Sequence, residues 1–117
     1  MKTADALEQL ADALTAAGIP CALDPRDVQL PGAWLKRNGV TPDLLCGGMT
    51  MRVRVMLISP DVGTLDALRF LDDLYALAHL VMPSNVPTPA TDTTALLPDS
   101  ATPYPATYFD VDVELTD

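Results

Sequence analysis

Two segments of the chain repeat their apolar residues with the period of an amphipathic helix. In the first, leucine or alanine recurs at positions 7, 10, 11 and 14, with polar side chains on the other face. Gly18 and Pro20 follow, as is typical of a helix end. The second helix is predicted from Thr64 to about Val81. Its apolar residues cover about half of the helical wheel, so we expect it to pack on a sheet and still offer an edge to a neighbour.

Two other segments alternate apolar and polar residues, as strands with one buried face do. They run over Thr50–Ile58 and Tyr108–Leu115. A third strand, Ala33–Arg37, is predicted to end in a turn at Asn38-Gly39, a dipeptide typical of tight hairpins. Three prolines interrupt residues 19–32, so only short extended pieces are predicted there.

Residues 83–105 hold six of the eleven prolines of the chain. A strand follows this stretch, so it is predicted to be an ordered arm or hairpin excursion of one domain, with a short strand near Thr93–Leu97 and a turn at Pro98-Asp99-Ser100. The order of elements predicts an α+β fold over residues 1–117. In it, two amphipathic helices cover one face of a small, mostly antiparallel sheet.

Composition agrees with a folded domain and excludes some partners. The 117 residues are 49% hydrophobic, which is too apolar for a disordered chain and enough for one core. The formal charge of −9 argues against a surface that grips nucleic acid or anionic membranes. No run approaches the roughly 18 to 20 apolar residues of a membrane span, and the first residues lead directly into the helical pattern. We therefore expect a soluble protein that is not exported.

The charges are distributed very unevenly along the chain. All seven bases lie within residues 1–69, together with eight acids, whereas residues 70–117 carry eight acids and no base. This pattern predicts two electrostatically different surfaces, unless the fold interleaves the two parts.

Residues that could support catalysis are scarce. His79, the sole histidine, lies near the end of the second predicted helix, where the helix dipole favours a histidine without any catalytic role. Cys21 and Cys46 are expected to be free thiols. A straight strand spreads the acids at 110, 112 and 114 about 7 Å apart, too far to converge on a metal ion. We therefore predict no enzyme activity, no catalytic residue, no cofactor and no metal.

Several residues are candidates for contacts between subunits or with a partner. Arg52 and Arg54 form a basic ladder on one strand that matches an acidic ladder on the last strand, either within one chain or across a subunit boundary. Trp34 is either a core residue or an interface anchor. The wide apolar arc of the second helix adds two more positions. The full set of interface candidates is Trp34, Arg52, Arg54, Phe70, Leu77, Asp110, Asp112 and Glu114.

The order of elements, together with several short phrases of sequence, resembles the tail terminators and neck proteins of long-tailed bacteriophages, most closely those that infect actinobacteria. The resemblance covers nearly the whole chain and includes a proline-rich segment followed by a terminal acidic strand. The phrases are Ala17–Pro20, Asp24–Val28, Leu30–Gly32, Arg52–Ile58 with Pro60-Asp61, and Leu65–Leu68 with Leu71–Leu74.

This resemblance implies a structural virion protein. Members of the family form a hexameric ring on the head-proximal end of the tail tube, stop its polymerisation and dock with the head connector. The implied partners are further copies of the chain, the tail tube protein and a head-completion or connector protein, and the implied location is the virion, after assembly in the host cytoplasm. DNA would pass through the ring without specific binding, because an acidic bore repels phosphates.

Two other functions remain open at this stage. A head-to-tail connector or minor capsid protein would share the size, the acidity and the α+β character of the chain. A small acidic inhibitor or binding module would use clustered carboxylates to imitate nucleic acid, and it would form a tight complex with a basic enzyme.

Overall fold

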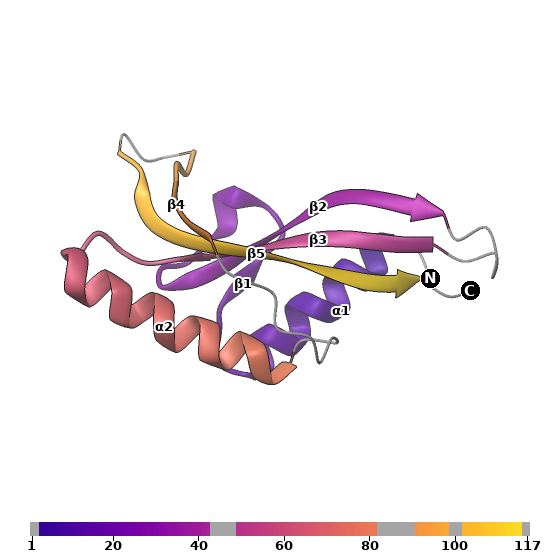
Figure 1. Cartoon of the computed structure of the whole chain (residues 1–117), viewed down its shortest axis with the longest axis horizontal. Coiled ribbons are helices and arrows are strands. Elements are labelled where there is room, and N and C mark those ends of the chain that lie inside the picture. Colours follow the sequence, from indigo (N-terminus) through magenta and orange to yellow (C-terminus); the bar gives the residue numbers. More distant parts are fainter. Residues whose placement is uncertain (1–2, 43–48, 82–90, 99–101, 116–117) are drawn as a thin grey trace.

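A computed structural model describes residues 3–42, 49–81, 91–98 and 102–115. These residues form a five-stranded sheet in the order β1-β2-β3-β5-β4 and two α-helices (Figure 1). All neighbouring strands are antiparallel except β1 and β2, which are parallel. The predicted α+β class and the mostly antiparallel sheet are thus confirmed. In chain order the elements are α1 (Thr3–Ala16), β1 (Cys21–Ala22), the 3-10 helix η1 (Pro25–Asp27), β2 (Gly32–Pro42), β3 (Met49–Ile58), α2 (Thr64–Val81), β4 (Thr91–Ala95) and β5 (Tyr104–Leu115).

The main core lies between the sheet and the helices, which Figure 1 shows together on one side of the sheet. β3 supplies its alternating apolar residues to this core, because successive side chains of a strand point to opposite faces. Leu14 of α1 and Leu71 and Leu74 of α2 belong to the same cluster. Tyr75 packs edge-on against Phe109 of β5, with 5.5 Å between the ring centroids. These contacts cover one face of the sheet, which we call the helix side.

A second, smaller cluster lies on the other face of the sheet, which we call the helix-free face. Its buried members are Ile58, Ala95 and Ala106. Val28 and Leu30, which follow η1, pack against this cluster. The chain around η1 therefore covers part of the helix-free face, and the rest of that face carries the polar residues of the central strands.

The prediction of a turn at Asn38-Gly39 is wrong. β2 continues past this dipeptide to Pro42 and stays paired with β3 throughout. The register shifts between Arg37, which pairs with Val53, and Val40, which pairs with Met51. The extra residue forms a β-bulge, and Gly39 adopts there the positive φ of 116° that glycine tolerates best. Asn38-Gly39, a dipeptide that favours tight turns, thus forms a bulge within β2 and does not end the strand.

The predicted proline-rich arm falls partly outside the described residues. Within it, β4 pairs with the first part of β5, so the described portion belongs to the sheet. β5 begins at Tyr104, four residues before the predicted start. Residues 82–90 and 99–101, including most of the predicted turn at Pro98-Asp99-Ser100, lie outside the described residues.

Candidate interface surfaces

The helix-free face brings the two predicted charge ladders together within one chain. The register of β3 and β5 sets Arg52 beside Asp112 and Arg54 beside Asp110. The Nε atoms of Arg52 and Arg54 lie 3.3 and 3.1 Å from carboxylate oxygens of their partners. The fold therefore interleaves the base-free part of the sequence with the basic part, and these two acids do not form a separate negative surface.

Arg54 is the more enclosed of the two arginines. Its side chain is 33% exposed, and its guanidinium lies 4.3 Å from the centroid of the Tyr108 ring. The hydrogen bond to Asp110 raises the pKa of Arg54 above its usual value. The arginine thus combines a charge-assisted hydrogen bond with a cation–π contact, and both hold its side chain against the sheet.

We expect both ion pairs to contribute little to stability, and the Arg54 pair to contribute more. Double-mutant cycles with Arg54→Ala and Asp110→Ala, and with Arg52→Ala and Asp112→Ala, should each give a coupling energy below about 1 kcal/mol. The Arg52 pair is the more exposed, so its coupling should be smaller and should disappear first as salt is added. Urea denaturation of the variants measures both values. A larger coupling for the Arg52 pair would contradict this picture.

Three charged side chains near these ladders have no ion-pair partner among the residues that the structure describes. The sheet register sets Lys36 of β2 beside Arg54, a like charge, and Glu114 of β5 beside Thr50. Within the described residues, no ion pair involves Lys36, Arg37 or Glu114. The sequence did not indicate Lys36 as a member of this surface, because its place beside Arg54 follows from the strand order.

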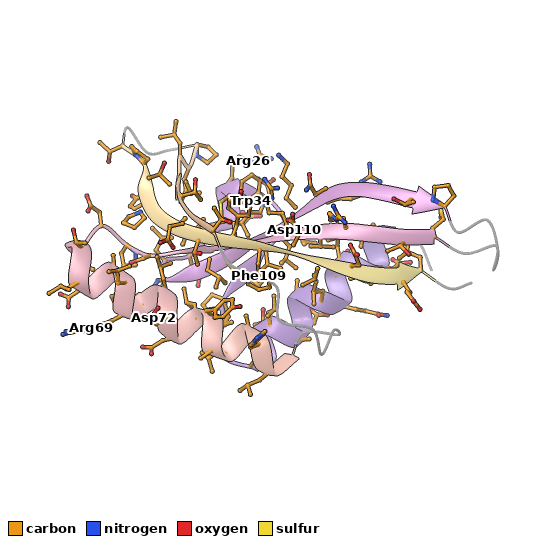
Figure 2. All side chains as sticks on the ribbon, viewed as in Figure 1. Arg26, Trp34, Arg69, Asp72, Phe109 and Asp110 are labelled. Carbon is orange, nitrogen blue, oxygen red and sulfur yellow. The ribbon has the colours of Figure 1, made fainter. Side chains whose placement is uncertain are left out.

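Trp34 belongs to the smaller cluster on the helix-free face. Its side chain is half-buried, and its indole Nε1 donates a hydrogen bond of 3.3 Å to the carbonyl oxygen of Leu23. Lys36 extends over the ring, with its Nζ 6.0 Å from the centroid. Figure 2 shows Trp34 and Asp110 on the helix-free face, whereas Phe109 points between the sheet and α2. The tryptophan therefore acts as a packing residue of this face, with part of its ring accessible.

The two candidates on α2 lie apart from the charge ladders. Leu77 packs on the main core close to Gly18, at the end of α1. Phe70 is half-buried and lines a shallow surface pocket together with Val62 and Asp73. Arg69, which forms a 3.3 Å ion pair with Asp66, contributes to the same pocket. Figure 2 shows Arg69 and Asp72 pointing away from the sheet.

α2 also exposes large apolar side chains that sequence analysis did not single out as interface candidates. Leu65 is 70% and Leu80 is 79% exposed, and both project from the face that carries the acids of the helix. Leu68, which the helical wheel assigned to the buried arc, is exposed as well. Two leucines among the charges of a polar face are the pattern that could have indicated this surface from the sequence.

The histidine and the described cysteine lie on different elements, α2 and β1. His79 is exposed near the end of α2, and its ring lies 5.1 Å from that of Tyr75. Burial raises the pKa of the Cys21 thiol to about 11, so this cysteine is a weak nucleophile at neutral pH. Among the residues that the structure describes, no three histidine, cysteine or acidic side chains gather to hold a metal ion. Cys46 lies outside those residues.

No family model, no curated protein and no solved structure matches this chain. Likewise, no helix in the described parts of the chain is long and apolar enough to cross a bilayer. Two surfaces of the described fold are therefore the candidates for a functional contact. One is the charged half of the helix-free face, and the other is the outer face of α2.

Proposed function

We propose that the chain is the subunit of a ring that terminates a bacteriophage tail tube and docks with the head. The observation that carries the proposal is the set of exposed leucines on the outer face of α2. Leu65 and Leu68, three residues apart in the first half of α2, are both exposed, with Leu80 at the other end of the helix, and Val62 just before the helix is exposed as well. Exposed apolar side chains that recur on one element are typical of a surface that a partner covers.

The fold supports a role in assembly. The chain is elongated, with principal extents of 48, 29 and 23 Å, and its sheet presents one face to the helices and one face to its surroundings. The order of helices and strands is also the order on which the resemblance to tail terminators rests. In a ring, the outer face of α2 would contact the tail tube or the head connector.

The charge of the chain supports the passage of DNA through the ring. A ring of subunits that each carry a formal charge of −9 repels phosphates and releases no counterions from DNA. Arginines neutralise Asp110 and Asp112, so the negative charge resides largely in other acids. Asp72 and Asp73 of α2 are two of these, since no base of the described residues forms an ion pair with them.

The proposal is tested by blocking synthesis of this protein during infection and imaging the lysate by electron microscopy. We expect overlong tails without heads, because the tube continues to grow when its stop is missing. Supplying the protein from a plasmid should restore the normal tail length. Tails of normal length that remain unattached would instead identify a head-to-tail connector, and intact particles would overturn the structural role altogether.

Variants supplied from the plasmid test the role of α2. Leu65→Asp combined with Leu68→Asp should fail to restore normal tails, because both side chains lie on the proposed contact face. Leu96→Asp is the control, since Leu96 is 67% exposed, close to the 70% of Leu65, and follows β4 in the chain instead of belonging to this helix. Circular dichroism of the purified variants checks that they fold. Full rescue by the double variant would exclude α2 as the contact.

A further inference from the structure

The sheet has two outer edges that the described strands do not cover. β1 pairs with β2 only at Ala33 and Trp34, so none of the described strands lies beside residues 35–42 on that side. β4 pairs with β5 only over Tyr104–Tyr108, so residues 109–115 are likewise without a neighbour among the described strands. We call these segments the β2 edge and the β5 edge. Such edges present unpaired backbone N–H and C=O groups to any strand that approaches.

The two edges carry opposite charges. The β2 edge bears Lys36 and Arg37 and no acid. The β5 edge bears three acids and no base. The two bases of the β2 edge, like Glu114 of the β5 edge, form no ion pair within the described residues. Lys36 of the β2 edge therefore lacks a counter-charge that an acid of a β5 edge could supply.

We propose that the β5 edge of a second copy of this chain adds to the β2 edge, so that one sheet continues from subunit to subunit. The inference rests on the proposed ring and specifies how its subunits join. β2 and β5 are both antiparallel to β3 and therefore run in the same direction. A continued sheet consequently joins the two copies through a parallel pair of strands.

Charge favours this junction over pairing between identical edges. Two β5 edges would set acids against acids, and two β2 edges would set bases against bases, which destabilises cross-strand pairs. A junction between different edges is heterologous, and such junctions close into rings when the rotation between subunits permits. The charges thus favour the heterologous junction that a ring requires, and they disfavour the junction between identical edges that a twofold dimer would use.

Residues that pair across neighbouring strands form rows across the sheet, and these rows indicate which side chains would meet at the junction. Lys36, Arg54 and Asp110 occupy one row across β2, β3 and β5. Where the next copy continues the same rows, its Asp110 lies beside Lys36 and gives this base an acidic neighbour. Thr41, Thr50 and Glu114 occupy another row, so Thr41 of one copy would lie beside Glu114 of the next.

Cysteine cross-linking tests the junction and its direction. Thr41→Cys and Glu114→Cys are introduced singly and together into a chain with Cys21→Ala and Cys46→Ala, and a short bismaleimide is added. We expect the variant with both cysteines to give a ladder of multimers on a denaturing gel. An equal mixture of the two single variants should stop at dimers, because each of its subunits can be linked only once.

Three results would overturn the proposal. Dimers from either single variant alone would show pairing between identical edges. The absence of cross-links in the double variant would show that the charges and the bulge only protect the edges from association. A ladder that survives Lys36→Glu with Arg37→Glu would show that the charges do not select the partner. The matched control, Lys36→Arg with Arg37→Lys, should preserve the ladder, and circular dichroism verifies folding in each variant.

This experiment is independent of the imaging of tails. A ladder together with normal particles after depletion would retain the edge junction and exclude the role in the tail. Overlong tails without a ladder would retain that role and place the contact between subunits on another surface.

Discussion

Replacing Leu14 by alanine should lower the free energy of unfolding by about 3 kcal/mol. Leu14 is 0% exposed and belongs to the cluster that joins α1, the sheet and α2. Truncation removes three carbons from a site where both helices and the sheet meet, and a rigid site of this kind relaxes only partly around the cavity. The loss comes from the lost apolar burial together with the cavity that remains.

Urea denaturation followed by circular dichroism measures this change, with Leu96→Ala as the matched control. Leu96 is 67% exposed, so its truncation should change the free energy by less than about 0.5 kcal/mol. A loss below about 1 kcal/mol for Leu14→Ala would mean that α1 is not packed on the sheet as described.

Gly32→Ala should be at least as damaging, although it adds only one carbon. A Cβ at this position would overlap the carbonyl oxygen of Gln29 and lie 2.8 Å from that of Pro20. Both atoms belong to the backbone, and the Pro20 carbonyl also accepts a hydrogen bond from the N–H of Ala33. The chain must therefore shift where β2 begins, and we expect a loss of about 3 kcal/mol or more.

Gly63→Ala is the control that separates steric overlap from backbone preference. Gly63 has a positive φ of 98°, but a Cβ there would meet no atom within 4 Å. Its replacement should cost only about 1 to 2 kcal/mol, the expense of a left-handed conformation. Thermal unfolding of both variants gives the comparison, and equal losses would rule out the close approach at Gly32.

Local patterns predicted the helices and the central strands well. β3 alternates so regularly that its buried residues could be listed before the structure was known, and the Gly18 and Pro20 stop places the end of α1 correctly. The pattern failed where long-range pairing decides the outcome. Asn38-Gly39 has the composition of a hairpin turn, but β3 continues beyond it and keeps the strand paired. The two-residue β1 is too short to leave a periodic pattern, so its parallel pairing was not predicted.

The candidate surfaces were likewise predicted only in part from the sequence. Alternation alone identified the ladders of Arg52 and Arg54 and of the acids on the last strand. Their pairing within one chain depends on the strand order, which no local pattern contains. Leu68 was wrongly assigned to the buried arc, because a helical wheel shows the face of a residue but not how far the sheet extends to cover it. Leu65 and Leu80 were missed because only the wide apolar arc was taken to indicate an interface.

The position of β5 has a consequence for how the protein is made. β3 meets β2 nearby in the sequence, whereas its contact with β5 joins residues 60 positions apart, as in the pair of Arg52 and Asp112. On the ribosome, α1, β2, β3 and α2 are all synthesised before β5. Until then, the second side of β3 is an apolar strand edge without a neighbour, and nascent chains are prone to associate through such edges. Stalled or truncated chains that lack β5 should therefore aggregate or remain bound to chaperones. Pairing of β5 with β3 is the step that allows the chain to leave the chaperone.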